Sequence, residues 1–152
     1  MATPEERLEE RGITLPEPPA PAAAYQPYRH SGDLVFTAGQ LPTEDGSLPA
    51  TGKLGDAIDT ARGQELAQTA AINILAQAKA AAGELSRVRM VKLTVFVAST
   101  PDFTEQHLVA NGASEFLGEV LGDDGVHARS AVGVPVLPLD SPIEIEAVLE
   151  VS

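Results

Sequence analysis

Apolar residues recur at intervals of three and four between residues 59 and 82, a pattern that predicts a long helix with one apolar face. The residues on this face are Leu66, Ala67, Ala70, Ile74, Ala78 and Ala81. Most of them are alanines, which favour helix and allow close packing against a sheet. Gly83 follows the pattern and is expected to end the helix.

Strands are predicted where apolar and polar residues alternate or where β-branched residues dominate. These stretches are residues 34–40, 89–98, 130–138 and 143–151. Between the first strand and the long helix, residues 42–55 are rich in glycine and proline and are expected to form turns.

A second helix is expected to follow the strand at 89–98, with Thr100 as its cap and Pro101 at its first position. Its core-facing residues are expected to be Val109, Ala113, Phe116, Leu117 and Val120. The pair Asn111-Gly112 is unusual in the middle of a helix, because glycine there costs about 1 kcal/mol relative to alanine. Either the helix breaks at this pair, or another segment approaches its backbone closely.

The N-terminal residues carry the pattern of a short helix. Thr3 is the expected cap, Pro4 suits the first helical position, and Glu6 completes a capping box. The Pro- and Ala-rich segment that follows, at 15–27, is expected to be extended and to lie on the body of the protein, with a free tail as the alternative. We therefore divide the chain into an extension at 1–24 and a domain at 25–152.

The order strand, helix, strand, helix, strand, strand predicts a two-layer α+β fold with a mixed sheet covered by two helices. The length of 152 residues fits one such domain. The net charge of −12 argues against a protein that coats nucleic acid or an anionic membrane, and the absence of cysteine excludes disulfides and thiolate catalysis. No apolar run approaches the ~20 residues of a membrane span, so we expect a cytoplasmic protein.

Arg129 is the most informative polar residue, because it is the sole Lys or Arg after Lys92, in a region with ten carboxylates. Alternation along its strand places Arg129, Ala131 and Gly133 on one face. The opposite face, with Val132 and Val134, is expected to be core. The small neighbours leave room beside the guanidinium for an anion, which it can hold bidentately. The alternative is a surface ion pair with Glu144 or Glu146.

The last strand places Glu144, Glu146 and Glu150 together on the face opposite its apolar residues. One of these carboxylates could orient or deprotonate a water beside an Arg-held substrate, and the alternative is a solvated charged face. His30, His107 and His127 are too scattered for a metal motif. His127 lies two residues before Arg129, and either lines the same pocket or sits in a surface loop.

Three stretches resemble the reactive intermediate deaminase family, also called the RidA or YjgF family, whose members are often labelled endoribonuclease L-PSP. They are residues 26–42, the helix-to-strand run 67–97, and 128–151 with its ARS, LP and IEIEA motifs. The resemblance covers the chain from about Ala22 to its end. It implies a chorismate-mutase-like fold, a homotrimer with pockets at subunit interfaces, and hydrolysis of enamines and imines of small carboxylates without metal or cofactor.

Carried over by position, the resemblance implies that Arg129 holds the substrate carboxylate, that Glu144 positions or activates water, and that Tyr28 closes the pocket. It also implies that Gly39 presents its backbone to the ligand. The chain departs from the family in three places, where Ala131 replaces a frequent Cys, Ala38 replaces a frequent Ser, and residues 107–116 include extra positions. Because of these extra residues, the pocket Asn of the family maps onto Asn111 ambiguously.

Three functions are compatible with this resemblance. The first is an enamine/imine deaminase that acts on 2-imino acids. The second is a non-catalytic trimeric protein that binds or senses a small metabolite, or interacts with a protein, through the same pocket. The third, a ribonuclease, follows only from the family label and conflicts with the net charge of −12.

Overall fold

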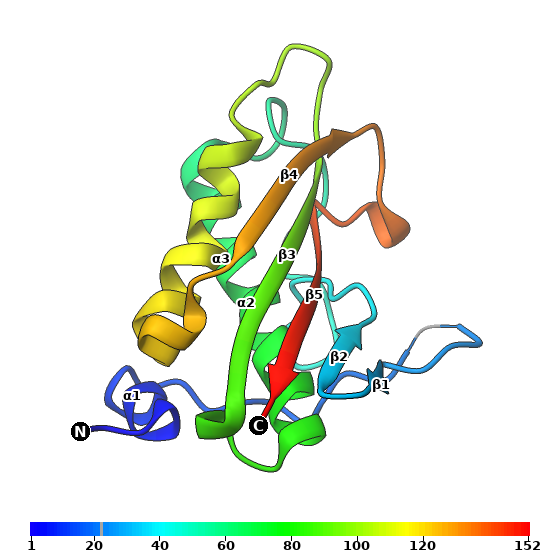
Figure 1. Ribbon diagram of the computed structural model, residues 1–152. Helices are drawn as coiled ribbons and strands as arrows, with labels where there is room; N and C mark the ends of the chain where they lie inside the picture. The colour runs from blue at the N-terminus through cyan, green and yellow to red at the C-terminus, as the bar shows by residue number, and fades with distance from the viewer. Residues whose placement is uncertain (22) are drawn as a thin grey trace.

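The computed structural model describes residues 1–21 and 23–152 (Figure 1). Ala22, which falls in the predicted Pro-rich segment and begins the resemblance, lies outside the described residues. The helices and strands are α1 (Pro4–Glu10), β1 (Tyr28–Ser31), β2 (Leu34–Thr37), α2 (Thr60–Ala82), β3 (Val88–Ala98), α3 (Gln106–Leu121), β4 (Ala128–Val134) and β5 (Ile143–Val151). Short 3-10 turns follow α2, α3 and β4.

The sheet has the strand order β1-β2-β5-β3-β4, in which only β3 and β4 pair in parallel. The helices α2 and α3 lie side by side on one of its faces, as Figure 1 shows. The predicted two-layer α+β fold is therefore confirmed. The sequence pattern missed β1, because this edge strand has only four residues and most of them are exposed and polar.

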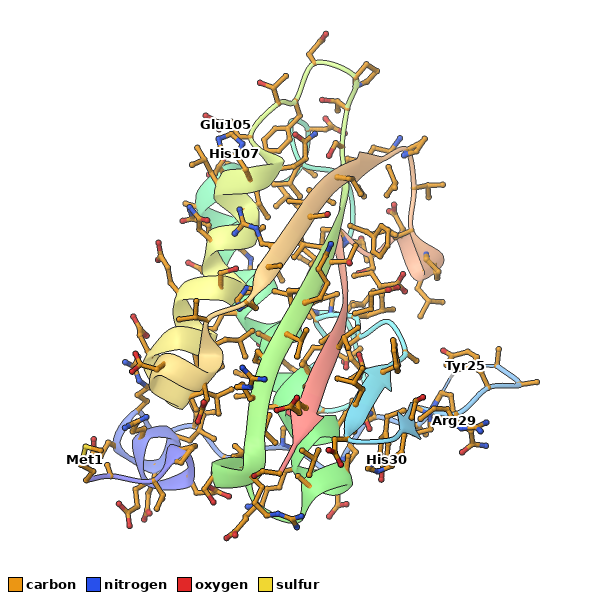
Figure 2. The ribbon with its side chains drawn as sticks, in the orientation of Figure 1. Met1, Tyr25, Arg29, His30, Glu105 and His107 are labelled. Atoms are coloured by element: carbon orange, nitrogen blue, oxygen red, sulfur yellow. The ribbon has the colours of Figure 1, made fainter. Side chains whose placement is uncertain are left out.

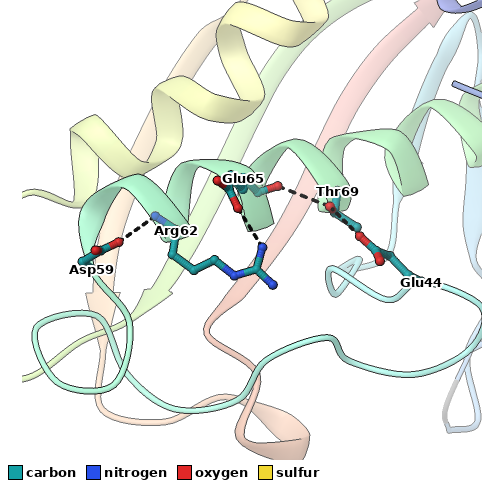
Figure 3. Close-up of polar contacts among 5 residues, drawn as sticks. All are labelled: Glu44, Asp59, Arg62, Glu65 and Thr69. Atoms are coloured by element: carbon teal, nitrogen blue, oxygen red, sulfur yellow. Dashed lines mark hydrogen bonds and ion pairs between the residues drawn. The ribbon is translucent and has the colours of Figure 1, made fainter. Parts of the chain in front are cut away.

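The predicted long helix is present as α2. Asp59 lies just before it, and its carboxylate accepts a hydrogen bond from the backbone N–H of Arg62 at 2.8 Å. Figure 3 shows this cap and, on the exposed side of the next turns, the Arg62–Glu65 ion pair and the contact between Thr69 and Glu44. The other side of the helix is buried against the sheet and α3.

Gly112 lies at a close contact between the backbones of α2 and α3. The helix α3 continues through Asn111 and Gly112 without a break. A Cβ atom at Gly112 would overlap the carbonyl oxygen of Gln64 and lie 2.7 Å from the Cα of that residue. Of the two interpretations of this pair, the close approach of another backbone is therefore the right one.

The predicted start of the second helix is wrong. The helix α3 begins at Gln106, and no side chain caps it. Thr100 continues the backbone pairing at the end of β3, because its N–H donates to the carbonyl oxygen of Leu54 at 3.0 Å, and its carbonyl oxygen accepts from Phe103 in a turn. Because the N–H and the carbonyl of Thr100 are both bonded outside the helix, α3 begins later in the sequence than predicted.

The prediction that the valine face of β4 is core is also wrong. Register pairs Arg129 with Leu93 and Ala131 with Val95, and both β3 residues are fully buried beneath the helices. Val132 pairs with Phe96 on the uncovered face and is 42% exposed. The small side chains of Ala131 and Gly133 explain the difference, since they leave room for α3 to approach this edge strand.

The N-terminal extension is packed onto the body of the protein. Leu8 is only 3% exposed and belongs to the hydrophobic core. Arg7 donates to the carbonyl oxygen of Val120 at 2.9 Å, and the carboxylate of Glu5 accepts from the N–H of Leu85 at 2.9 Å. The capping box at Thr3 and Glu6 is formed as predicted. The extension is therefore part of the folded structure.

We expect Leu8→Ala to lower the free energy of unfolding by about 2–3 kcal/mol, because it removes buried methyl groups and leaves a cavity beneath α1. Glu10→Ala on the same helix is the matched control, since Glu10 is exposed. Urea denaturation followed by circular dichroism measures both values. Equal free energies of unfolding for the two variants would show that the packing of α1 through Leu8 contributes little to stability.

Candidate functional site

Arg129 is held in place by three groups of α3. Its Nη1 donates to Oδ1 of Asn111 at 2.9 Å and to Oγ of Ser114 at 3.1 Å. Its Nη2 donates to the carbonyl oxygen of His107 at 3.1 Å. Among the described residues, Arg129 forms no ion pair with Glu144 or Glu146, so that alternative is wrong for the single chain.

These contacts leave part of the guanidinium available. Of its five N–H groups, two on Nη1 and one on Nη2 are used, and the Nε–H and the second Nη2–H have no acceptor among the residues described. The side chain is partly exposed. A guanidinium that is fixed on one side and open on the other is suited to hold a carboxylate.

Ser114 links Arg129 to His127. The hydroxyl of Ser114 accepts from Arg129 and lies 2.9 Å from Nε2 of His127. The Nδ1 atom of His127 lies 2.6 Å from the carbonyl oxygen of Gly125, which only accepts, so Nδ1 carries the proton and Nε2 accepts from Ser114. His127 lines a shallow cavity of about 300 Å³ together with Arg129 and Ser114.

Asn111 and Ser114 are the residues of the second predicted helix whose side chains contact Arg129. The match of Asn111 to the pocket Asn of the family stays a prediction, but its side chain does contact Arg129. Ser114 was missed, although it lies three residues after Asn111, a spacing that puts both side chains on one helix face. Ala131, two residues after Arg129, is half-buried against the core on the same side of the sheet.

Glu144 lies on β5 beside Gly39. A Cβ atom at Gly39 would lie 2.7 Å from the Cδ of Glu144, so a larger residue here would force the Glu144 side chain to move. Gln40 is paired with Ile145 through two backbone hydrogen bonds of 2.7 and 3.0 Å, which fixes Gly39 at this position. Burial, and then the carboxylate of Glu146, raise the pKa of Glu144 above its ordinary value of 4.5. A carboxylate in this state is suited to exchange a proton with water.

The raised pKa of Glu144 predicts how stability depends on pH. The folded state holds this proton more tightly than the unfolded chain, so the contribution of Glu144 to the free energy of unfolding falls as the pH rises above 4.5. Gln cannot ionise. We therefore expect Glu144→Gln to be more stable than the parent protein at about pH 7 and to lose this advantage near about pH 4.

Urea denaturation at the two pH values tests this expectation. Glu115→Gln is the control, because Glu115 is exposed on α3 and its substitution is expected to leave stability unchanged. A Glu144→Gln variant that is less stable than the parent at neutral pH would contradict the assigned environment of the carboxylate.

Arg129 and Glu144 point to opposite faces of the sheet. Arg129 pairs with Leu93, whose side chain is buried under the helices. Glu144 pairs with Phe96, and Phe96 also pairs with Val132 on the uncovered face. Because directly paired residues share a face, one chain does not bring the two groups together.

Tyr28 is separated from Arg129 by the whole width of the sheet. It lies on the edge strand β1, where its ring packs edge-on against His30 at 5.9 Å. Four strand spacings separate β1 from β4, or about 19 Å. Figure 2 shows Arg29 and His30 of β1 far from His107, whose carbonyl oxygen accepts from Arg129. Any site that combines Tyr28 with Arg129 therefore needs a second copy of the chain.

The uncovered face of the sheet presents apolar side chains to solvent. Phe36 is 46% exposed and Val132 is 42% exposed, and the partly buried Phe96 lies on the same face. A mixed sheet of this size with one bare, partly apolar face is typical of a surface that another protein copy covers.

Two kinds of feature are absent from the part of the chain that the structure describes. No group of three or more histidine, aspartate or glutamate side chains is arranged to hold a metal ion. No described helix is both long and apolar enough to cross a membrane.

The candidate site consists of two groups of residues on opposite faces of the sheet. They are Arg129, Asn111, Ser114 and His127 on one face and Gly39 and Glu144 on the other.

The sequence matches a protein-family model described as "YjgF/chorismate mutase-like, putative endoribonuclease" over residues 5–150. Among curated proteins, Protein TCP17 of Trypanosoma cruzi is 45% identical over 147 residues, which cover 95% of this chain and 92% of that protein. The family model covers most of the N-terminal helix as well as the α+β body.

Solved structures are also similar to this chain over nearly its whole length. A protein of unknown function from Agrobacterium tumefaciens is 49% identical, with a TM-score of 0.91 over 98% of this chain and 92% of the other. The E. coli protein TdcF, solved with bound serine, is 28% identical, with a TM-score of 0.66 over 90% and 94% of the two chains. Similarity in sequence and in fold thus extends to proteins of Agrobacterium tumefaciens and E. coli.

Proposed function

This chain belongs to the YjgF/RutC family, and on that premise we propose that it hydrolyses 2-imino and enamino acids to 2-oxo acids and ammonia. The observation that carries the proposal is Arg129, which α3 holds so that two N–H groups remain free for a carboxylate. The non-catalytic alternative would use the same anion site without turnover.

The proposed active site lies between copies of the chain in a homotrimer. Arg129 with Asn111 comes from one copy, and Glu144 with Gly39 and Tyr28 comes from the next. Two features support this arrangement, namely the placement of Arg129 and Glu144 on opposite faces and the bare sheet face that includes Phe36. A heterologous contact of this kind closes into a ring.

In the proposed reaction, Arg129 anchors the substrate carboxylate and Glu144 orients a water molecule toward the imine carbon. The water oxygen bonds to this carbon while Glu144 takes one water proton. Glu144 delivers this proton to the nitrogen, which has received the C=N π electrons, and a carbinolamine forms. Glu144 then carries the hydroxyl proton of the carbinolamine to the nitrogen, the C–N bond breaks as the C=O bond forms, and ammonia leaves the 2-oxo acid. An enamino acid first moves a proton from its nitrogen to its terminal carbon and so becomes the imine. The imine carbon is already electrophilic, so the reaction needs positioning rather than a metal, a cofactor or a strong nucleophile.

The test is the release of pyruvate and ammonia from freshly generated 2-aminoacrylate. The proposal expects release well above the spontaneous rate. In parallel, a thermal-shift assay with pyruvate measures binding alone. Stabilisation by pyruvate without faster release would favour the non-catalytic binding protein, and the absence of both effects would contradict both functions.

A further inference from the structure

Two buried amide side chains lie one turn apart on α2. Asn73 is 2% exposed and Gln77 is 0% exposed. Buried amides are costly unless they are hydrogen-bonded, so their partners show what they do. The Nδ2 atom of Asn73 donates to the carbonyl oxygens of Leu41 and Thr43 at 2.9 and 3.1 Å. Asn73 therefore holds the segment that follows Gly39 and Gln40.

Gln77 connects the same segment to the N-terminal extension. Its Nε2 donates to the carbonyl oxygen of Pro19 at 2.9 Å, and at 3.5 Å it makes a long hydrogen bond to Oε1 of Gln40. The Nε2 of Gln40 in turn donates to the carbonyl oxygen of Ala38 at 3.3 Å. A chain of amide hydrogen bonds thus runs from the extension at Pro19 to the residue beside Gly39.

Gln40 connects this chain of hydrogen bonds to the candidate site. Its backbone is bonded on both sides to Ile145, and the neighbours of these two residues are Gly39 and Glu144. The space between Gly39 and the carboxyl group of Glu144 is too small for a methyl group. A small displacement of Gly39 would therefore change how closely the backbone covers Glu144.

The Oε1 atom of Gln77 is buried and accepts no hydrogen bond from the residues described. An apolar side chain of the same length would avoid this cost. Glutamine, however, donates the two Nε2 hydrogen bonds to Pro19 and Gln40, which an apolar side chain could not form.

We propose that Gln77 is a positioning residue, which ties the N-terminal extension to Gln40 and thereby holds Gly39 against Glu144. This inference deepens the proposed function and rests on it where turnover is concerned. It gives the N-terminal extension a role in the site, in addition to its packing through Leu8.

The test uses Gln77→Met in the full chain, because methionine nearly keeps the length and volume of glutamine but donates no hydrogen bond. Gln64→Met is the matched control. Gln64 lies on the same helix, and its Nε2 also donates to a backbone carbonyl at 2.9 Å, but this carbonyl belongs to Leu108 of α3. The two variants lose the same chemical group at different places.

The first measurement is the titration of Glu144 in the ligand-free protein, followed by ¹³C NMR of its labelled carboxyl group. We expect the titration midpoint to fall toward the ordinary value in Gln77→Met, because water reaches the carboxylate more freely, and to stay unchanged in Gln64→Met. The other charged residues on this face are the same in both variants; they are Glu146, Glu150, Lys92, Arg89 and Arg29. Equal midpoints in Gln77→Met and the parent protein would overturn the proposal.

The second measurement is kcat/KM for 2-aminoacrylate. We expect roughly a tenfold loss in Gln77→Met and none in Gln64→Met, with melting temperatures of the two variants within a few degrees of each other. A melting temperature lowered in Gln77→Met alone, with Glu144 titrating as in the parent, would assign Gln77 a structural role only. The NMR titration needs no turnover, so it decides the positioning role even if the proposed reaction fails.

Discussion

Arg129→Ala is expected to lower kcat/KM for 2-aminoacrylate at least ~100-fold. The variant removes the two free N–H groups that we assign to the substrate carboxylate, and each hydrogen bond to a charged group contributes about 1.5–3 kcal/mol. It also removes the sole Lys or Arg of the sequence after Lys92, a region whose other charged groups are carboxylates. Initial rates of pyruvate formation over a range of substrate concentrations measure the loss.

Two further variants make this result specific. Arg129→Lys keeps the charge but not the planar fork, so an intermediate loss is expected. Arg62→Ala removes an arginine that pairs with Glu65 at 2.8 Å on the outer side of α2, and its rate is expected to equal that of the parent. Equal rates for Arg129→Ala and the parent would rule out Arg129 as the anchor.

Gly112→Ala is expected to cause the largest loss of stability, about 3 kcal/mol or more. The new Cβ would overlap the backbone of Gln64, which cannot rotate away as a side chain can. The helices α2 and α3 would have to separate, and the neighbouring Asn111 would then move away from Arg129. Urea denaturation measures the stability, and a pyruvate thermal-shift assay measures the effect on the anion site.

Gly118→Ala is the matched control, because Gly118 lies on the same helix and a Cβ there would meet no atom within 4 Å. We expect this variant to be as stable as the parent or up to about 1 kcal/mol more stable, since alanine favours helix. If Gly112→Ala were as stable as Gly118→Ala, the close contact between the two helices would be wrong.

The elements with a regular pattern were predictable from the sequence. β5 has the predicted bounds, 143–151, because apolar and acidic residues alternate over most of its length. α2 also agrees, since Asp59 and Gly83 mark its ends. For Asn111-Gly112 the sequence left a helix break or a close backbone approach as alternatives, and only the structure shows the approach of Gln64.

The arrangement of the site was less predictable. Both faces of β4 combine small and apolar residues, so alternation alone did not show that α3 covers Ala131 and leaves Val132 exposed. Ser114 and Gln77 gave no signal, because a lone polar residue on an apolar helix acquires its meaning only from a partner such as Arg129 or Pro19. The sequence motifs identified Arg129 and Glu144, but strand register was needed to place them on opposite faces.

Subunit complementation tests the central claim that Arg129 of one copy acts with Glu144 of the next. The Arg129→Ala and Glu144→Gln chains carry different affinity tags, are expressed together, and are purified through both tags so that every trimer contains both chains. In such a ring, one of three interfaces joins an intact Arg129 to an intact Glu144. Each variant alone is expected to be nearly inactive and the mixed trimer to recover about a third of the parent activity. Mixed trimers that remain as inactive as the separate variants would contradict a site shared between copies.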